Sequence, residues 1–217
     1  MNTTDCDLPE SRWNEALVRL GVDPNLPYQV SPFNAGRRVY FGSDVIYKVI
    51  APGVRRGRQD ARGEYELLRR CDNLSGVPRV DDVCQLDGWE VLVCQRIHGR
   101  CLFDTPISWF LLFRVVCGVA MVLLRMSRRG VCHHDLTLRN VMVDTDGRVW
   151  IIDYDRGSQT SRGRAFCLNL LARGSRHPEV RRAFLGFVRE AYQSMRARNH
   201  LLGHVSQAAS DGRDVGE

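Results

Sequence analysis

The spacing of apolar side chains predicts a strand-rich first half of the chain. Residues 45–50 alternate around a single lysine, and residues 89–93 form a second apolar run, so we predict a strand at each. Between them, residues 60–71 carry apolar side chains at helical spacing, which predicts a helix. A short amphipathic helix is predicted at residues 10–20, where Gly21 closes the pattern, and we expect it to be peripheral.

The second half begins with one long apolar segment. Residues 107–124 are almost entirely apolar and about long enough to span a bilayer. Because Arg114 near the middle would cost a few kcal/mol in lipid, we favour a helix buried in the protein core. A last helix is predicted at residues 178–195, and the small and polar residues of 204–217 predict a disordered tail.

Polar residues at a specific spacing follow the long apolar segment. Asp135 precedes Asn140 by five positions, and residues 141–152 then form two short apolar runs joined by an Asp-Thr-Asp-Gly turn. This pattern predicts a hairpin that brings Asp153 back beside Asn140. A kinase-type phosphotransferase needs one carboxylate at the acceptor hydroxyl, and an amide and a carboxylate on magnesium. We assign these roles to Asp135, Asn140 and Asp153, and we expect His133 to brace the loop.

A kinase site also needs a cation on the nucleotide phosphates, steadied by a carboxylate. Lys48 in the strand 45–50 is the candidate for this catalytic and nucleotide-binding role. Glu64 lies close enough to the apolar stripe of the predicted helix to reach inward, so we predict it as the partner of Lys48. Glu66 is the second choice. Taken alone, Lys48 could equally be a solvated lysine at a strand edge.

The loop that covers the nucleotide is less well marked, since no GxGxxG motif is present. Gly36 with Arg37 is the better candidate for the covering turn. Gly42 is the alternative, although Gly-Ser-Asp between strands is also common in hairpins. The linker between the lobes is predicted at residues 94–99, where backbone groups of Gln95 and Ile97 would contact the adenine edge.

Composition and charge indicate a cellular location and a class of binding partner. The chain has 217 residues, a formal net charge of +6 and eight cysteines with no CxxC pair. Scattered cysteines without a signal-peptide pattern predict reduced thiols and a cytoplasmic location. Clustered arginines suit an anionic membrane face or phosphorylated glycolipid, which favours peripheral contact with the inner membrane. Charge alone would suit RNA equally, but nucleic acid is disfavoured because no RNA-binding motif is present.

The motifs together resemble the lipopolysaccharide-core kinases, including the 3-deoxy-manno-octulosonic acid (Kdo) kinases, a small atypical branch of the protein-kinase-like superfamily. The likeness lies in Ala35-Gly36-Arg37 with Tyr40, in His133-His134-Asp135-Leu136 with Asn140, and in Ile152-Asp153-Tyr154-Asp155-Arg156-Gly157. A second likeness, to the RIO and KEOPS-type kinases, lies in residues 76–78 and 135–137.

The resemblance implies an α+β, two-lobed protein-kinase-like fold with a reduced C-lobe, using ATP and Mg²⁺. We expect an N-terminal extension at residues 1–27, an N-lobe at 28–94, a helical C-lobe at 95–203 and the tail at 204–217. These boundaries follow the predicted strands, the linker and the catalytic loop.

Departures from the protein-kinase pattern bear on the acceptor. His134 stands where regulated kinases carry an arginine, and Asp153-Tyr154-Asp155 replaces Asp-Phe-Gly, which favours a fixed magnesium ligand. The short remainder of the chain favours a lipopolysaccharide-core sugar or related small acceptor over a peptide, with Arg156 and Arg162 as acceptor contacts. An atypical RIO- or KEOPS-like serine/threonine kinase, a partner-dependent ATPase and a nucleotide-binding pseudokinase scaffold are the alternatives.

Overall fold

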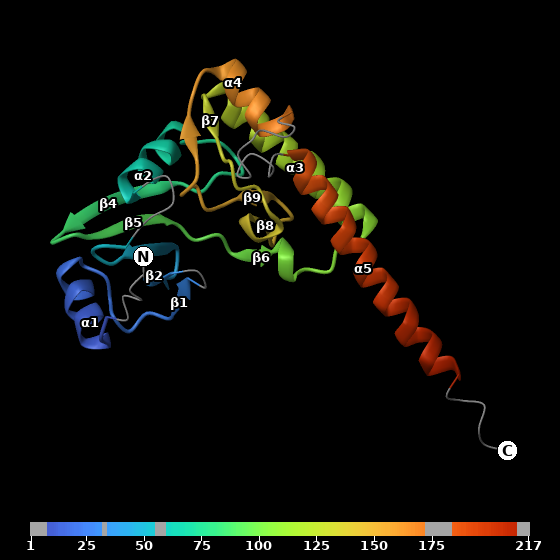
Figure 1. Ribbon diagram of the computed structural model, residues 1–217, viewed down its shortest axis with the longest axis horizontal. Helices are drawn as coiled ribbons and strands as arrows, with labels where there is room; N and C mark the ends of the chain where they lie inside the picture. Colours follow the sequence, from blue (N-terminus) through green and yellow to red (C-terminus); the bar gives the residue numbers. More distant parts are fainter. Residues whose placement is uncertain (1–7, 32–33, 55–59, 172–183, 212–217) are drawn as a thin grey trace, which may run out of the picture.

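The computed structural model describes residues 8–31, 34–54, 60–171 and 184–211, and they form a sheet-rich lobe and a helical lobe (Figure 1). The first lobe contains α1 (Glu10–Arg19), β1 (Tyr28–Ser31), β2 (Asn34–Phe41), β3 (Val45–Ile50), α2 (Ala61–Arg70), β4 (Val80–Leu86) and β5 (Trp89–Gln95). The second contains β6 (Gly99–Cys101), η1 (Leu102–Asp104), α3 (Trp109–Arg128), β7 (Val131–Cys132), η2 (Leu138–Asn140), β8 (Val141–Asp144), β9 (Val149–Ile151), β10 (Ser158–Gln159), α4 (Arg162–Phe166), η3 (Cys167–Leu171) and α5 (Phe184–Asp211).

The five strands of the first lobe form one antiparallel sheet in the order β1-β2-β3-β5-β4. Because successive side chains of a strand point to opposite faces, Val49 and Ile50 of β3 belong to different clusters. Val49 packs with Val91 and α1, whereas Ile50 packs with Leu92 and α2 in the main core. Lys48 lies two residues before Ile50, so the strand period directs it to the face that α2 covers.

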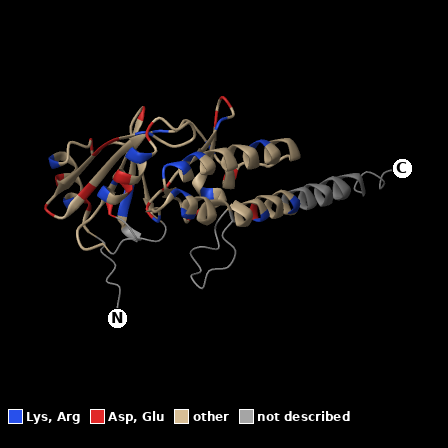
Figure 2. Cartoon of the chain, turned by 90° about the horizontal axis from the view of Figure 1, so that it is seen from above, with Lys and Arg blue, Asp and Glu red and all other residues tan. Residues whose placement is uncertain are grey.

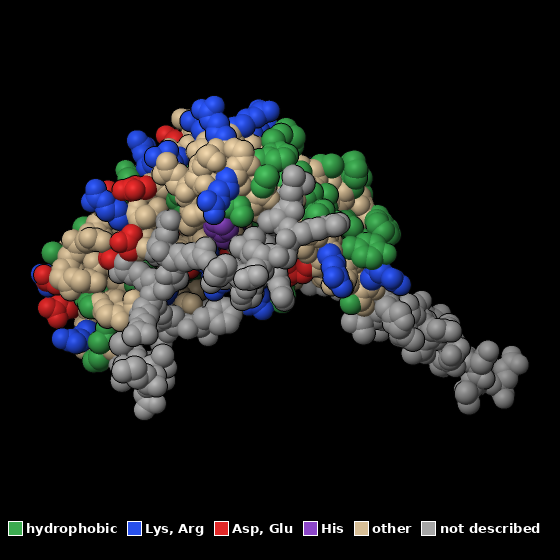
Figure 3. All heavy atoms as spheres, turned by 45° about the horizontal axis from the view of Figure 1, so that its top comes forward, with side chains coloured by type: hydrophobic (Ala, Val, Ile, Leu, Met, Phe, Trp, Pro, Cys, Tyr) green, Lys and Arg blue, Asp and Glu red, His purple; other side chains and the backbone are tan. Residues whose placement is uncertain are grey.

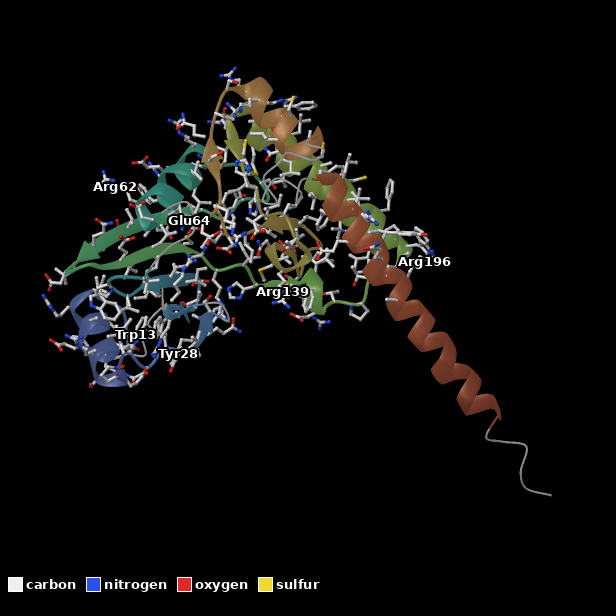
Figure 4. All side chains as sticks on the ribbon, viewed as in Figure 1. Trp13, Tyr28, Arg62, Glu64, Arg139 and Arg196 are labelled. Carbon is white, nitrogen blue, oxygen red and sulfur yellow. The ribbon has the colours of Figure 1, made fainter. Side chains whose placement is uncertain are left out.

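Helix α1 is an integral part of the first lobe, which corrects the expectation of a peripheral extension. Trp13, labelled in Figure 4, is 1% exposed and meets Trp89 edge-on, with ring centroids 4.8 Å apart. The Arg38 guanidinium lies 4.1 Å from the Trp13 ring and forms a 2.7 Å ion pair with Glu10. The helix therefore seals the outer face of the sheet.

Trp13→Ala is expected to destabilise the protein by about 3–5 kcal/mol, because truncating a buried tryptophan leaves a cavity that its neighbours cannot fill. Urea unfolding should measure this loss. Val18→Ala is the matched control, since Val18 lies on the same helix but is 66% exposed. Equal losses for the two variants would contradict the packing of α1 described above.

Gly76 allows the sheet lobe and the helical lobe to approach closely. Its φ of +92° lies in the region that glycine favours, and its carbonyl accepts a 2.9 Å hydrogen bond from the Ile151 amide. A Cβ at this position would collide with the Val122 side chain and the Val149 carbonyl. The segment before β4 is thereby joined to α3 and β9 without space for a side chain.

Helix α3 forms the centre of the second lobe and runs beside α5 (Figure 2). The Ser108 hydroxyl caps its N-terminus by accepting a 3.2 Å hydrogen bond from the Leu111 amide. One face is buried, at Leu112, Val115, Val119, Val122, Leu123, Met126 and Ser127. The opposite face exposes Phe110, Phe113 and Met121, so the predicted burial holds for only part of the helix.

Among the described residues, α3 is the one helix that is long and apolar enough to cross a membrane by length and composition. Its most apolar 18-residue window has a mean hydropathy of 2.0, and 39% of that window is buried inside the protein. More than half of that window therefore lies on the surface of the described structure.

Helix α5 extends further than the sequence predicted. The part of the predicted 178–195 helix before Phe184 lies outside the described residues, as do residues 212–217. Residues 204–211 are helical and not disordered, which corrects the expected tail. Phe187, Ala191 and Met195 anchor the helix in the core, and helix propagates readily from a packed segment into good helix formers such as alanine.

Candidate active site

Lys48 lies between two carboxylates that come from distant parts of the chain. Its Nζ is 2.6 Å from Glu64 Oε1 of α2 and 3.0 Å from Asp153 Oδ1, which follows β9. Burial would lower the pKa of the Lys48 ammonium, but the attraction of Glu64 and Asp153 outweighs it and the pKa is raised. The lysine is therefore charged throughout the physiological range, as a phosphate-binding cation must be.

The structure brings Glu64, and not Glu66, to Lys48. Asp60 caps α2 by accepting a 2.7 Å hydrogen bond from the Gly63 amide, which fixes where the helix begins. Glu64 is 4% exposed, and its Oε1 also accepts a 3.1 Å hydrogen bond from the Tyr154 amide (Figure 4). The Glu66 side chain is 66% exposed and pairs with Arg62. Glu64 thus ties Lys48 to the segment that carries Asp153.

Glu64→Gln is expected to lower kcat by about tenfold or more, because a neutral amide holds the buried ammonium less firmly. Glu66→Gln should change kcat by less than about twofold, since that side chain pairs only at the surface. Steady-state rates of ATP turnover measure both variants. Two equal rates would contradict the selective role of Glu64.

His133 braces the loop that carries Asp135. The imidazole Nδ1 accepts a 3.3 Å hydrogen bond from the Asp135 amide, so Nε2 is the nitrogen that donates, over 2.9 Å, to the Ile152 carbonyl. The ring also meets Tyr154 edge-on, at 4.8 Å between centroids. Burial lowers the pKa of His133 and outweighs the nearby carboxylates, so the neutral ring is favoured. Both ring nitrogens are used structurally, in agreement with the predicted bracing role.

The lowered pKa of His133 predicts a loss of stability in mild acid. An unfolded histidine takes up its proton near pH 6.5, whereas folded His133 resists it, so the unfolded state binds more protons below that pH. Stability should therefore fall from pH 6.5 to pH 5.5, by up to about 1.4 kcal/mol per pH unit. Urea unfolding at the two pH values measures the slope. His98→Gln, at an exposed site, should keep the slope and His133→Gln should reduce it; an unchanged slope in His133→Gln would refute the assignment.

Asn140 and Asp153 meet at one end of the β8–β9 hairpin, as predicted. Asn140 Nδ2 donates a 2.8 Å hydrogen bond to the Asp135 carbonyl, and the Asn140 carbonyl accepts one of 2.9 Å from the Ile152 amide. These bonds leave Oδ1 as the amide atom for a metal. Burial would raise the pKa of Asp153, but Lys48 and other cations lower it, so the carboxylate is ionised. An amide oxygen and a carboxylate are hard donors that fit Mg²⁺.

Two arginines pair with the aspartates around this hairpin. Arg37 Nη1 lies 2.9 Å from Asp155 Oδ2, which joins β2 of the first lobe to the second lobe. Arg156 Nε lies 3.8 Å from Asp135 Oδ2, and the Arg156 side chain is about half exposed. The predicted acceptor contact is therefore adjacent to the predicted base, whereas no contact joins Arg162 to either aspartate among the described interactions.

The residues predicted to cover the nucleotide lie in β2 and at the β2–β3 turn, and those predicted for the linker lie at the end of β5 and just after it. Gly36 lies inside β2 and not in a turn, because its carbonyl accepts a hydrogen bond from the Ala51 amide as part of the sheet. Gly42 forms the β2–β3 hairpin turn. At the linker, the Gln95 amide already donates to the Arg79 carbonyl over 2.8 Å, and Ile97 is half-buried in the loop after β5. Adenine contact by Gln95 and Ile97, and phosphate contact by Gly36 and Arg37, stay predictions.

Asn169 is a site residue that the sequence analysis missed. It is 3% exposed, and its Oδ1 accepts a 3.1 Å hydrogen bond from the His133 amide. Its Nδ2 donates to the Ser127 hydroxyl and the Val131 carbonyl, at 3.0 and 2.8 Å. The side chain thereby fastens η3, α3 and β7 behind the catalytic loop. A lone amide in the apolar run 166–171 was the available signal.

The chain is similar to known proteins in its fold and in part of its sequence. Two structures of WbdD, one titled a bifunctional kinase-methyltransferase, superpose with TM-scores of 0.51 and 0.50 at 17% and 18% identity. Each covers 78% of this chain, which spans 46% and 45% of theirs. A probable serine/threonine-protein kinase, MARK-B of Dictyostelium discoideum, is 27% identical over 57% of this chain and 18% of its own length. The chain thus spans less than half of each relative.

The matches show a protein-kinase-like fold, which confirms the predicted two-lobed fold class. Within that class, residues 114–182 match the lipopolysaccharide kinase (Kdo/WaaP) family. The matched segment includes Asp135, Asn140, Asp153 and Asn169 but begins well after Lys48. The resemblance predicted from the motifs is therefore confirmed for residues 114–182.

Proposed function

We propose that the protein transfers the γ-phosphoryl group of ATP to a hydroxyl of a lipopolysaccharide-core sugar or a related small acceptor. The observation that carries this proposal is the joining of Lys48, Glu64 and Asp153 within 3.0 Å beside the Asp135–Asn140 loop. Such a constellation aligns a cation for phosphates, oxygen ligands for a metal and a carboxylate for an acceptor.

Each side chain then has a defined task. Lys48, held by Glu64, binds the nucleotide phosphates, and Asn140 Oδ1 with Asp153 would hold Mg²⁺. When bound, Mg²⁺ would neutralise the negative charge on the phosphate oxygens, which is redistributed during the transfer. Asp135 orients the acceptor hydroxyl and accepts its proton, while His133 keeps the loop in place. The chain thereby contributes positioning and charge complementarity.

The choice of a sugar acceptor is supported by the match of residues 114–182 to the lipopolysaccharide kinase family. Arg156, half exposed beside Asp135, suits an acceptor that carries acidic groups. A cytoplasmic location, where ATP is available, is part of the same proposal.

ATP consumption by the purified chain with Mg²⁺ tests the proposal, with a deacylated lipopolysaccharide-core oligosaccharide, a serine/threonine peptide or no acceptor. We expect turnover only with Mg²⁺ and an increase with the oligosaccharide. An increase with the peptide alone would favour the atypical protein kinase. Nucleotide binding without turnover in all three mixtures would favour the pseudokinase scaffold, and turnover restored by a second protein would favour a partner-dependent enzyme.

A further inference from the structure

Helix α3 is apolar on two opposite faces. Its exposed face carries Phe110, Phe113, Cys117 and Met121 at spacings of three and four residues, so they form one stripe along the helix. Phe110 and Phe113 are each about 70% exposed. A helix that is apolar all round belongs inside a large core or against lipid, so the exposed stripe needs a further explanation.

Trp109 and a tyrosine of α5 extend this stripe, and a phenylalanine of η1 lies six positions before Trp109 in the chain. Trp109 begins α3 and is 63% exposed, and its ring lies 5.8 Å from the ring of Tyr192 on α5. Phe103 of η1 is also exposed. We call the set the aromatic face: Phe103, Trp109, Phe110, Phe113, Met121 and Tyr192. Figure 3 shows hydrophobic side chains gathered over the helical lobe, with arginine side chains beside them.

Three arginines lie over rings of the aromatic face. The guanidinium of Arg139 lies 4.3 Å from the Phe103 ring, that of Arg114 lies 5.7 Å from Phe110, and that of Arg196 lies 5.9 Å from Tyr192 (Figure 4). The sequence of α3 contains three arginines and no aspartate or glutamate. Surfaces that rest at the headgroup level of anionic bilayers typically expose aromatic rings with arginines among them.

We propose that the aromatic face docks on an anionic lipid bilayer, with its rings among the headgroups and its arginines on lipid phosphates. Arg139, which packs on the Phe103 ring, immediately precedes Asn140, so the Phe103 end of the face lies beside the catalytic loop. If the proposed function holds, docking would bring that loop to a lipid-anchored acceptor. The docking itself does not depend on the transfer reaction.

The structure favours docking over a membrane span by α3. Seven residues of the helix are buried in the second lobe, and α3 leads directly into β7 and the catalytic loop. Moving α3 into lipid would remove those residues from the core. A second copy of the chain is the competing occupant of the face, and the test below separates it from a bilayer.

Flotation of the full chain with lipid vesicles tests the proposal. We expect binding to phosphatidylcholine vesicles that contain phosphatidylglycerol, weaker binding to phosphatidylcholine alone, and weakening by salt. The triple variant W109S/F110S/F113S should lose at least about tenfold in partitioning. Val18→Ser is the matched control, since Val18 is equally exposed but lies on α1 in the other lobe, and it should bind like the wild type.

Tryptophan fluorescence gives a second readout on the unmodified chain. Trp109 is the most exposed of the four tryptophans, so its entry among headgroups should shift emission to shorter wavelength.

Arg196→Gln should reduce the preference for anionic vesicles without altering the melting temperature, which keeps the test informative if the triple variant is unstable. Undiminished binding by a folded triple variant would overturn the proposal. So would concentration-dependent dimerisation of the wild type that the triple variant abolishes, with no binding to vesicles.

The two proposals can fail separately. A thermal shift with ATP and Mg²⁺ reports on the nucleotide site, and none of the substituted residues belongs to that site. Vesicle binding without any nucleotide-induced shift would support docking and refute the proposed kinase function. Nucleotide binding without vesicle binding would refute docking alone.

Discussion

Asp135→Asn is expected to lower the rate of phosphoryl transfer by at least about 100-fold while nucleotide affinity changes by less than about twofold. The amide keeps the shape of the carboxylate but cannot accept the acceptor proton, and proton transfer by a positioned side chain contributes about 10²–10⁴-fold. Asp135 is nearly buried, and its side chain pairs with Asn140 and Arg156 and not with Lys48. Single-turnover rates with acceptor and equilibrium binding of ATP measure the two effects.

Asp104→Asn is the control for this substitution, because Asp104 is an exposed aspartate of the same lobe, in η1. It should leave both quantities unchanged. Normal turnover in Asp135→Asn would remove Asp135 from the mechanism. A loss of nucleotide binding equal to the loss of rate would assign it to the nucleotide site.

Asp153→Ala is expected to weaken Mg²⁺-dependent ATP binding by about tenfold or more, which corresponds to roughly 1.4 kcal/mol. The substitution removes an oxygen donor beside Asn140 and one of the two carboxylates that hold Lys48. Glu64 still pairs with the lysine, so the fold should persist. Isothermal titration with and without Mg²⁺ separates the metal-dependent part of the affinity.

Asp146→Ala provides the comparison for Asp153→Ala. Asp146 lies in the turn of the same hairpin, and its side chain is 67% exposed. The control should bind ATP like the wild type in Mg²⁺, and Asp153→Ala should differ from it little in EDTA. Unchanged Mg²⁺-dependent affinity in Asp153→Ala would contradict its role at the metal.

The arrangement around Lys48 was predictable because each part has a local signal. The alternation in residues 45–50 gives β3, the Asp60 cap and apolar spacing give α2, and the Asp-Thr-Asp-Gly turn gives the β8–β9 hairpin. The period of two residues in β3 then directs Lys48 inward, and the helical period of α2 does the same for Glu64. Lys48, Glu64 and Asp153 meet where β3, α2 and the β8–β9 hairpin come together.

Contacts without a local signal were not predictable. The pairing of Arg37 with Asp155 joins residues 118 positions apart, and the bonds of Asn169 depend on how η3 packs behind the loop. Hydrophobic spacing in residues 107–124 indicated a helix but not which side is covered, since α3 is apolar on both. Likewise, the pattern of α1 gave a helix, but its role in sealing the sheet depends on Arg38 and Trp89.

The central claim is phosphoryl transfer to a sugar hydroxyl through Asp135, and the mass of the acceptor tests it most directly. A lipopolysaccharide-core oligosaccharide would be incubated with ATP, Mg²⁺ and either the wild type or Asp135→Asn, and then weighed by mass spectrometry. The account predicts that the wild type adds one phosphoryl group and that Asp135→Asn adds none in the same time. An oligosaccharide of unchanged mass after ATP has been consumed by the wild type, or equal phosphorylation by both proteins, would contradict it.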